Sequence, residues 1–291
     1  MSFGRLVTAM CTPFTPDYQI DWNSLAKLID HLIETGTDTI VVAGTTAESP
    51  TLSKEEKLEL FRFTVKQVGG RGKVIAGTGS NNTAETVEFT KKAETTGVDG
   101  VMVVAPYYNK PSQEGLYQHF RTVAEATTLP VMVYNVPGRT GCNLLPATAA
   151  RLAQIPNVVA FKEASGNLSQ ISELIGLIDS EIAVYSGDDS LTLPILAVGG
   201  AGVVSVASHV IGNQLEEMMD AFFAGEVKEA AELHRKYQPV MEGLFMTSSP
   251  VPLKYALSHM ELTPTTVRLP LVEMSEEEKE KAQSWLILIE K

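Results

Sequence analysis

Cysteine is nearly absent from this chain of 291 residues, which contains only two. Cys11 and Cys142 form no CxxC motif, and two cysteines cannot build the disulfide framework of a small secreted domain. The five histidines are scattered and form neither an HxH nor an HExxH pair. We therefore expect no protein-bound metal, and a protein of the reducing cytoplasm.

A basic cluster is also missing. The 35 acidic residues outnumber the 23 lysines and arginines, and the formal net charge is −12. Nucleic-acid binding relies on clustered Lys and Arg to neutralise phosphates, so no nucleic-acid partner is expected. The sequence Gly77-Thr78-Gly79 is not a GxGxxG motif, and nothing supports a dinucleotide cofactor.

One segment, 195–212, carries no Asp, Glu, Lys or Arg and has the length of a membrane span. It contains four glycines, however, and is better interpreted as a helix end near Gly199 followed by a buried strand from Gly202. The N-terminal stretch is interrupted by Gly4 and Pro13 and lacks the long apolar core of a signal peptide. These features favour a soluble, cytoplasmic protein with no membrane partner.

What the sequence does contain is a regular alternation of short apolar runs and amphipathic stretches. Hydrophobic residues make up 44% and charged residues 20%, an ordinary globular composition. Most of the runs are continuously apolar, which is typical of strands covered on both faces. The predicted strands are Leu6–Met10, Thr39–Ala43, Val74–Gly77, Gly100–Ala105, Val131–Asn135, Val158–Lys162, Ile182–Ser186 and Val203–Val206.

The stretches between these runs have helical periodicity, and Ser53 with Glu56 forms a capping box. Repeated strand-and-helix units favour an α/β fold of the (β/α)8 TIM-barrel type, with an open doubly wound sheet as the alternative on pattern alone. The first predicted helices are Trp22–Glu34, Lys54–Val68, Ala84–Thr96 and Glu114–Ala126.

After Gly225 the apolar runs stop. Residues 226–246 have helical periodicity, Pro250–Met260 suits a shorter helix, and Ser275–Glu290 a capped, charged one. We predict a catalytic barrel domain at 1–225 and a C-terminal helical domain at 226–291, packed on the barrel or on a neighbouring subunit.

Lys162 ends the apolar run 158–161. Side chains alternate along a strand, so Lys162 shares a face with Val158 and Ala160. Barrel enzymes build their sites at the carboxyl ends of strands. A lysine facing inward there loses solvation, its pKa falls, and the neutral amine can attack a carbonyl. A structural lysine paired with Glu163 is the alternative, although adjacent strand residues point to opposite faces.

Other strand ends carry polar groups. Tyr134 can pass protons if it is hydrogen-bonded into a chain with Thr46 and Tyr107 or Tyr108, or its ring can simply plug the barrel mouth. Arg139 follows a Pro-Gly turn and suits bidentate binding of a carboxylate, with a surface arginine as the alternative.

At two further strand ends, the polar residues suit either a structural role or the binding of a ligand. The loop 44–46 offers backbone N–H groups and hydroxyls to a carboxylate, or is a plain turn. The pair Asp188-Asp189 suggests magnesium, but no third carboxylate lies nearby in sequence. We predict instead that Asp189 caps a helix over Ser190–Val198.

Five motifs, taken together and in order, resemble the dihydrodipicolinate synthase family of pyruvate-dependent Schiff-base lyases and aldolases. The resemblance covers essentially the whole chain. It implies a (β/α)8 barrel with a C-terminal helical domain, in a homo-oligomer that is more often a tetramer than a dimer. The motifs are GTTAESPTLS, PYYNKPSQEGLYQHF, YNVPGRTG, FKEASGN and YSGDD.

The resemblance also implies an activity without a cofactor. Pyruvate would condense with L-aspartate 4-semialdehyde to give 4-hydroxy-tetrahydrodipicolinate, the first committed step towards diaminopimelate and lysine. Lys162 would form the Schiff base, and Tyr134 would relay protons through Thr46 to Tyr108 of an adjoining subunit. Arg139 would hold the carboxylate of the aldehyde. The remaining implied contacts are those of Thr45 and Thr46 with the pyruvate carboxylate and of the Gly187 and Val204 backbones with the bound ketoacid.

Two departures from the family pattern have consequences. Ala47 replaces the last glycine of GTTG, so the loop is strained or shifted if that residue has a positive φ. Lys54 and Lys57 stand where lysine-inhibited members have histidines in an effector pocket. Two cations facing a cationic effector predict weak or absent inhibition by L-lysine. The matching residues of that pocket are Ser49, Asn81, Glu85 and Tyr107.

The alternatives share the lysine, the tyrosine and pyruvate. They are N-acetylneuraminate lyase, a 2-keto-3-deoxy-sugar acid aldolase, or a non-catalytic pyruvate-binding relative. Arg139 and the paired tyrosines Tyr107 and Tyr108 favour a short aldehyde that bears a carboxylate.

Overall fold

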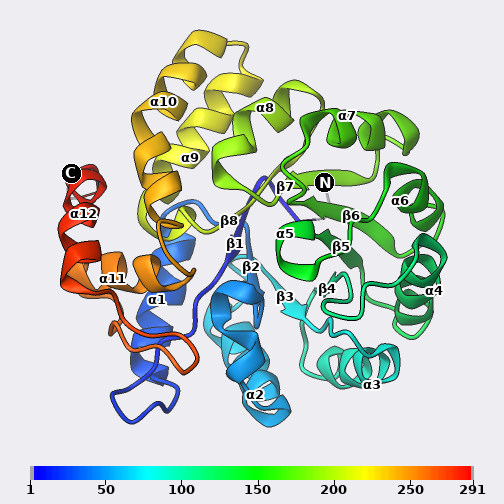
Figure 1. The fold of residues 1–291 in the computed structure, drawn as a ribbon, viewed down its shortest axis with the longest axis horizontal. Coiled ribbons are helices and arrows are strands. Elements are labelled where there is room, and N and C mark those ends of the chain that lie inside the picture. The colour runs from blue at the N-terminus through cyan, green and yellow to red at the C-terminus, as the bar shows by residue number, and fades with distance from the viewer. Residues whose placement is uncertain (1–2, 290–291) are drawn as a thin grey trace.

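The computed structural model describes residues 3–289. Eight parallel strands form a closed barrel in which each strand pairs with the next, and β8 pairs with β1 through Leu6 and Val203 (Figure 1). The predicted (β/α)8 barrel is therefore confirmed, and each predicted strand agrees with an observed one to within a residue at either end. The strands are β1 (Leu6–Ala9), β2 (Thr39–Val42), β3 (Lys73–Gly77), β4 (Gly100–Val104), β5 (Val131–Asn135), β6 (Val158–Glu163), β7 (Ala183–Ser186) and β8 (Gly202–Ser205).

The strands are apolar on both faces because each face packs against a different core. Val7, Val41 and Ile75 point into the barrel, where they pack with Tyr185. The alternate residues point outward against the helices. A polar side chain at the end of an inward row, such as Lys162, therefore emerges at the barrel mouth.

Helices surround the barrel, and local chemistry sets their ends (Figure 1). Helix α2 begins at a capping box formed by Ser53 and Glu56, as predicted, and ends at Gly69 with φ 58°. The helices of this layer are α1 (Trp22–Glu34), α2 (Lys54–Val68), α3 (Thr83–Glu94), α4 (Gln113–Ala124), α6 (Pro146–Leu152), α7 (Leu168–Leu177), α8 (Thr192–Ala197) and α9 (Ser208–Phe223). The short helix α5 (Pro137–Thr140) follows β5 and lies inside this ring (Figure 1). Short 3-10 turns are η1 (Thr45–Ala47), η2 (Ser49–Thr51) and η3 (Asp189–Leu191).

The C-terminal helices lie at one side of the barrel, where α10 runs beside α9 (Figure 1). They are α10 (Val227–Gly243), α11 (Val251–His259) and α12 (Glu276–Leu286). The expected domain boundary falls at Gly225, in the turn between α9 and α10. Helix α12 packs closely on α10, since Gly243 has no side chain and lets the Trp285 ring approach. A Cβ on Gly243 would lie only 2.4 Å from that ring. The last predicted helix residue, Glu290, lies outside the described residues.

Candidate active site

Lys162 is buried at the mouth of the barrel, with only 6% of its surface exposed. It is paired in register with Tyr134 of β5 and with Tyr185 of β7. The pKa of Lys162 is lowered to about 8: burial is the main cause, the carboxylate of Asp189 opposes the shift, and the nearby Arg139 adds to it. A substantial fraction of this amine is therefore neutral near pH 8, as a nucleophile requires.

Glu163 does not pair with Lys162. Its carboxylate accepts hydrogen bonds from Asn135 Nδ2 at 2.7 Å and from Ser165 Oγ at 2.7 Å, outside the barrel interior. Burial raises the pKa of Glu163, and these two bonds oppose that shift. The alternation of strand side chains explains the separation, and it leaves the Lys162 amine free of a direct carboxylate partner in the described part of the chain.

Tyr134 places its ring centroid 4.2 Å from Lys162 Nζ. Burial raises the pKa of its phenol to about 12, although Arg139 and a hydrogen bond with the Thr45 side chain oppose the increase. The phenol therefore keeps its proton at neutral pH and can donate it. The hydroxyl that is hydrogen-bonded to this phenol belongs to Thr45, whereas the family resemblance implies Thr46 in that place.

The turn that carries these threonines contains left-handed residues, but Ala47 is not one of them. Positive φ angles occur at Ala43 (56°) and Glu48 (57°), on either side of η1. Ala47 lies inside η1, and its carbonyl accepts a hydrogen bond from Thr12 Oγ1 at 3.0 Å. An alanine therefore fits this position without the strain that a positive φ would impose.

Asp189 does not cap a helix, and that prediction was wrong. Its buried carboxylate accepts hydrogen bonds from the backbone N–H groups of Val206 and Ala207, both at 3.0 Å, and from the hydroxyl of Ser205. The residue that caps the following turn is Asp188, which accepts from Ser190 N at 2.9 Å. Asp189 therefore links the ends of β7 and β8 beneath the site.

Two cavities meet at the barrel mouth. One of about 570 Å³ contains Lys162, and one of about 500 Å³ extends towards α2. Thr45, Tyr134 and Arg139 line both of them. The larger cavity is also lined by Thr46 and Gly187, so it gathers most of the site residues that the sequence predicted.

Three predicted residues lie elsewhere. Tyr108, with φ 74°, is 89% exposed and lines neither cavity. The Val204 side chain is buried in the barrel interior, and the next residue but one, Val206, lines the larger cavity. Asn81 precedes α3, and its carbonyl accepts from Asn109 Nδ2 at 2.8 Å.

One wall of the larger cavity comes from the C-terminal helices. Met241, Glu242 and Phe245 line it, together with Ser249. Met241 and Glu242 lie on α10, and Phe245 and Ser249 lie in the connection to α11. These residues could not be predicted from the sequence, because a helical period does not show which distant strand ends they face.

The geometry defines a class of protein: a barrel enzyme with a desolvated lysine at a strand end, a protonated phenol beside it and an arginine at the cavity rim. Such a site can form an imine with a carbonyl compound that bears a carboxylate. Among residues 3–289, no group of three His, Cys, Asp or Glu side chains is placed to hold a metal ion. In the same residues, every helix is too short or too polar to cross a membrane.

Comparison with known proteins agrees with this class. Residues 2–288 match the model of the dihydrodipicolinate synthetase family, and the chain belongs to that family. It is 58% identical over 281 residues to a 4-hydroxy-tetrahydrodipicolinate synthase of Desulforudis audaxviator, covering 97% of this chain and 96% of the relative.

Two solved structures of the family have the same fold over nearly the whole chain. A dihydrodipicolinate synthase of Bacillus anthracis is 53% identical, with a TM-score of 0.96 and 98% of each chain covered. The enzyme of Cyanidioschyzon merolae, crystallised with lysine bound, is 45% identical, with a TM-score of 0.97 and 99% of each chain covered.

Proposed function

We propose that this protein is a 4-hydroxy-tetrahydrodipicolinate synthase that condenses pyruvate with L-aspartate 4-semialdehyde through a Schiff base on Lys162. The observation that carries this proposal is the buried Lys162 amine, its pKa lowered to about 8, 4.2 Å from the ring of Tyr134. The names of the relatives support the reaction. The product leads to diaminopimelate and lysine.

The reaction starts with attack of the neutral Lys162 amine on the keto carbon of pyruvate. Tyr134 donates its proton to the hydroxyl of the resulting carbinolamine, which leaves as water and gives the imine. Loss of a methyl proton then forms the enamine, whose carbon attacks the aldehyde of the second substrate. The amine of that substrate displaces Lys162 by transimination, which closes the ring and frees the enzyme.

Proton transfer needs a chain of hydroxyl groups. The hydrogen bond between Tyr134 and the Thr45 side chain makes Thr45 the next member of the chain, in place of Thr46. The backbone and hydroxyl groups of both threonines are suited to the pyruvate carboxylate, with Gly187 and the Val204 backbone near the ketoacid. Arg139 at the cavity rim suits the carboxylate of the aldehyde, because a guanidinium binds it through two parallel hydrogen bonds.

We also propose a homo-oligomer, a tetramer rather than a dimer, in the cytoplasm. The exposed ring of Tyr108 supports an assembly of subunits, since a large aromatic side chain that lines neither cavity of its own chain is suited to contact with a neighbouring chain. In that assembly Tyr108 would complete the proton relay of an adjoining subunit. Light scattering during gel filtration would measure the subunit number.

A steady-state assay with purified protein tests the reaction. Turnover of pyruvate with L-aspartate 4-semialdehyde is expected, and borohydride reduction in the presence of pyruvate should label the peptide that contains Lys162. Cleavage of sialic acid or a keto-deoxy-sugar acid instead would favour another aldolase of the superfamily. A folded protein that forms no adduct would contradict the Schiff-base mechanism.

Imine formation should increase with pH up to the pKa of Lys162. Below this pKa only the neutral amine reacts, so the trapping rate rises about tenfold per pH unit and levels off above about pH 8. Tyr134, with a pKa of about 12, stays protonated in this range and therefore does not alter the pH dependence of the trapping rate. The measurement is the initial rate of cyanoborohydride trapping of pyruvate against pH. A continued rise towards pH 10.5, the usual lysine pKa, would contradict the site described here.

L-Lysine should inhibit weakly or not at all. The smaller cavity is lined by Lys54 and Lys57. Burial lowers the pKa of Lys57, and the positive charge of Lys54 nearby lowers it as well. A cationic amino acid would add charge of the same sign. Ser49, Glu85 and Tyr107 also line this cavity.

The lysine prediction is tested by initial rates with millimolar L-lysine, compared with the Lys57→Gln variant. That variant removes one cation from the cavity wall and should become more sensitive to lysine than the wild type. Strong inhibition of the wild-type protein would show that the two cations do not exclude the effector.

A further inference from the structure

The turn between β2 and α2 is tied to the C-terminal segment by a buried ion pair. Glu48 is the residue that follows η1, and its side chain is 1% exposed. Its Oε1 accepts a hydrogen bond at 2.5 Å from Nζ of Lys254 on α11, whose side chain is completely buried. The two residues are 206 positions apart in the chain.

The second carboxylate oxygen of Glu48 is also occupied. It accepts the backbone N–H of Arg268 at 2.8 Å, while Lys254 Nζ donates to the carbonyl of Thr266 at 2.8 Å. Both ends of the ion pair are thus held by the segment that follows α11. The Glu48 carboxylate is removed from water, but its charge is paired with that of Lys254 and each of its oxygens accepts a hydrogen bond.

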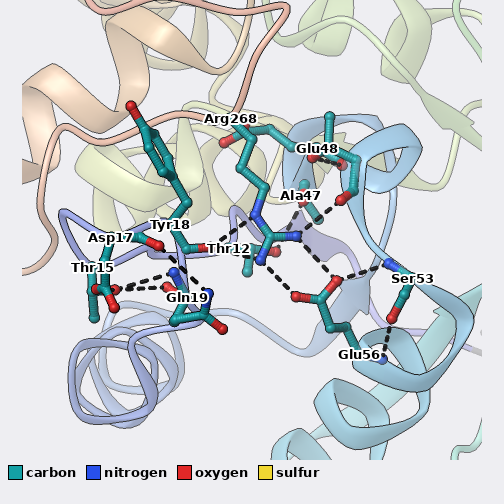
Figure 2. A network of polar contacts seen from close by, with 11 residues as sticks. Thr12, Thr15, Asp17, Tyr18, Gln19, Ala47, Glu48, Ser53, Glu56 and Arg268 are labelled. Atoms are coloured by element: carbon teal, nitrogen blue, oxygen red, sulfur yellow. Dashed lines mark hydrogen bonds and ion pairs between the residues drawn. The ribbon is translucent and has the colours of Figure 1, made fainter.

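Arg268 connects the same segment to two more loops. Its guanidinium pairs with Glu56 at 2.6 Å and donates to the carbonyls of Tyr18, at 2.7 Å, and Thr51, at 2.9 Å (Figure 2). Glu56 also closes the capping box of α2 with Ser53. The start of α2 and the β1–α1 loop are therefore fixed together against the C-terminal segment.

This arrangement bears on the site because Glu48 has a left-handed backbone. A non-glycine residue keeps such a conformation only when its surroundings impose it. The Glu48 N–H donates to the carbonyl of Thr45 at 3.1 Å, so the position of Glu48 sets the last bond of η1. A buried ion pair adds little stability compared with apolar groups of the same size, so the role that we assign to this one is to hold a single geometry.

We propose that Lys254 is a positioning residue for the reaction: by holding Glu48, it fixes the Thr45–Thr46 turn that receives the carboxylate of pyruvate. The inference rests on the proposed function, because it assigns that turn to the ketoacid. It predicts that loss of the ion pair weakens the use of pyruvate more than that of the second substrate.

The test compares the Lys254→Met, Glu48→Gln and Glu48→Gln/Lys254→Met variants of the full chain. All three should raise the KM for pyruvate at least tenfold and leave the KM for L-aspartate 4-semialdehyde within about twofold of wild type. Lys254→Met alone leaves an unpaired buried carboxylate and should have the lowest Tm. The double variant removes that charge, so its Tm should recover while its pyruvate KM stays high.

A matched control is Arg71→Met, which removes the 2.5 Å ion pair with Asp30 near the other end of α2. It should leave both KM values unchanged. The inference is overturned if the double variant, or Glu48→Gln where the others fail to fold, keeps a pyruvate KM within twofold of wild type. Absence of a pyruvate adduct in the wild type is a different result, and it would refute the proposed function itself.

Discussion

Replacing Lys162 with methionine should abolish turnover and leave the barrel folded. Methionine has nearly the same length as lysine and no amine, so the buried position stays filled while the imine cannot form. Loss of a covalent nucleophile lowers kcat/KM by about four orders of magnitude or more. Steady-state kinetics would measure the loss, and borohydride with pyruvate should label no peptide of the variant.

The control for this change is Lys228→Met, on the exposed side of α10. It removes an amine in the same way and should retain wild-type kinetics and labelling. Thermal unfolding separates a chemical effect from misfolding. Removing the Lys162 amine also removes the cost of burying a charge, so the Tm of that variant should be equal to or higher than the wild-type value. Residual activity above about one per cent would mean that another amine carries the reaction.

Tyr134→Phe should lower kcat about 100- to 10,000-fold, as expected for the loss of a positioned proton donor. The ring still fills the barrel mouth, so packing is preserved. Without the phenol, however, no side chain beside Lys162 donates the proton that lets the carbinolamine hydroxyl leave as water. Slow imine formation should therefore persist. Trapping with cyanoborohydride would show an adduct on Lys162 that accumulates far more slowly than in the wild type.

Tyr185→Phe is the matched control. Tyr185 is also buried in the barrel and is the partner of Lys162 in register, but its phenol donates to the carbonyl of Gly4 at 2.8 Å, at the opposite end. Loss of that bond costs about 1 kcal/mol of stability and should not change kcat. If Tyr134→Phe keeps the same kcat as Tyr185→Phe, the Tyr134 hydroxyl is not the proton donor.

Much of the fold follows from local patterns. The continuous apolar runs identify strands that are covered on both faces, and eight of them, separated by amphipathic stretches, are enough to indicate a barrel. The two-residue period of a strand also places Lys162 on the inward face of Ala160. The prediction that Val158 shares this face was wrong, because the pairing of β5 with β6 shifts register between them and Val158 packs in the outer core. Tyr134 is found in the same way, near the end of β5, and Arg139 by the Pro-Gly turn that follows this strand.

Side-chain partners at loops are less accessible to such reasoning. The sequence pattern suits either Asp188 or Asp189 as a cap, and only the path of the chain after β8 brings the N–H groups of Val206 and Ala207 to Asp189. Likewise, Thr45 and Thr46 are equivalent by composition. The 3-10 turn, which rotates successive side chains by a third of a circle, decides which hydroxyl meets Tyr134.

By itself, the sequence determined the strands, the helices between them, the inward lysine and the polar strand ends, because these depend on periods of two to four residues within one element. Closure of the barrel, which the number of strands favoured over an open sheet, comes from the pairing of β8 with β1. The tertiary structure alone decided the depth at which Lys162 lies, the wall supplied by α10, and the ion pair between Glu48 and Lys254. Desolvation and charge pairing depend on atoms brought together from distant parts of the chain, and no local pattern records which parts those are.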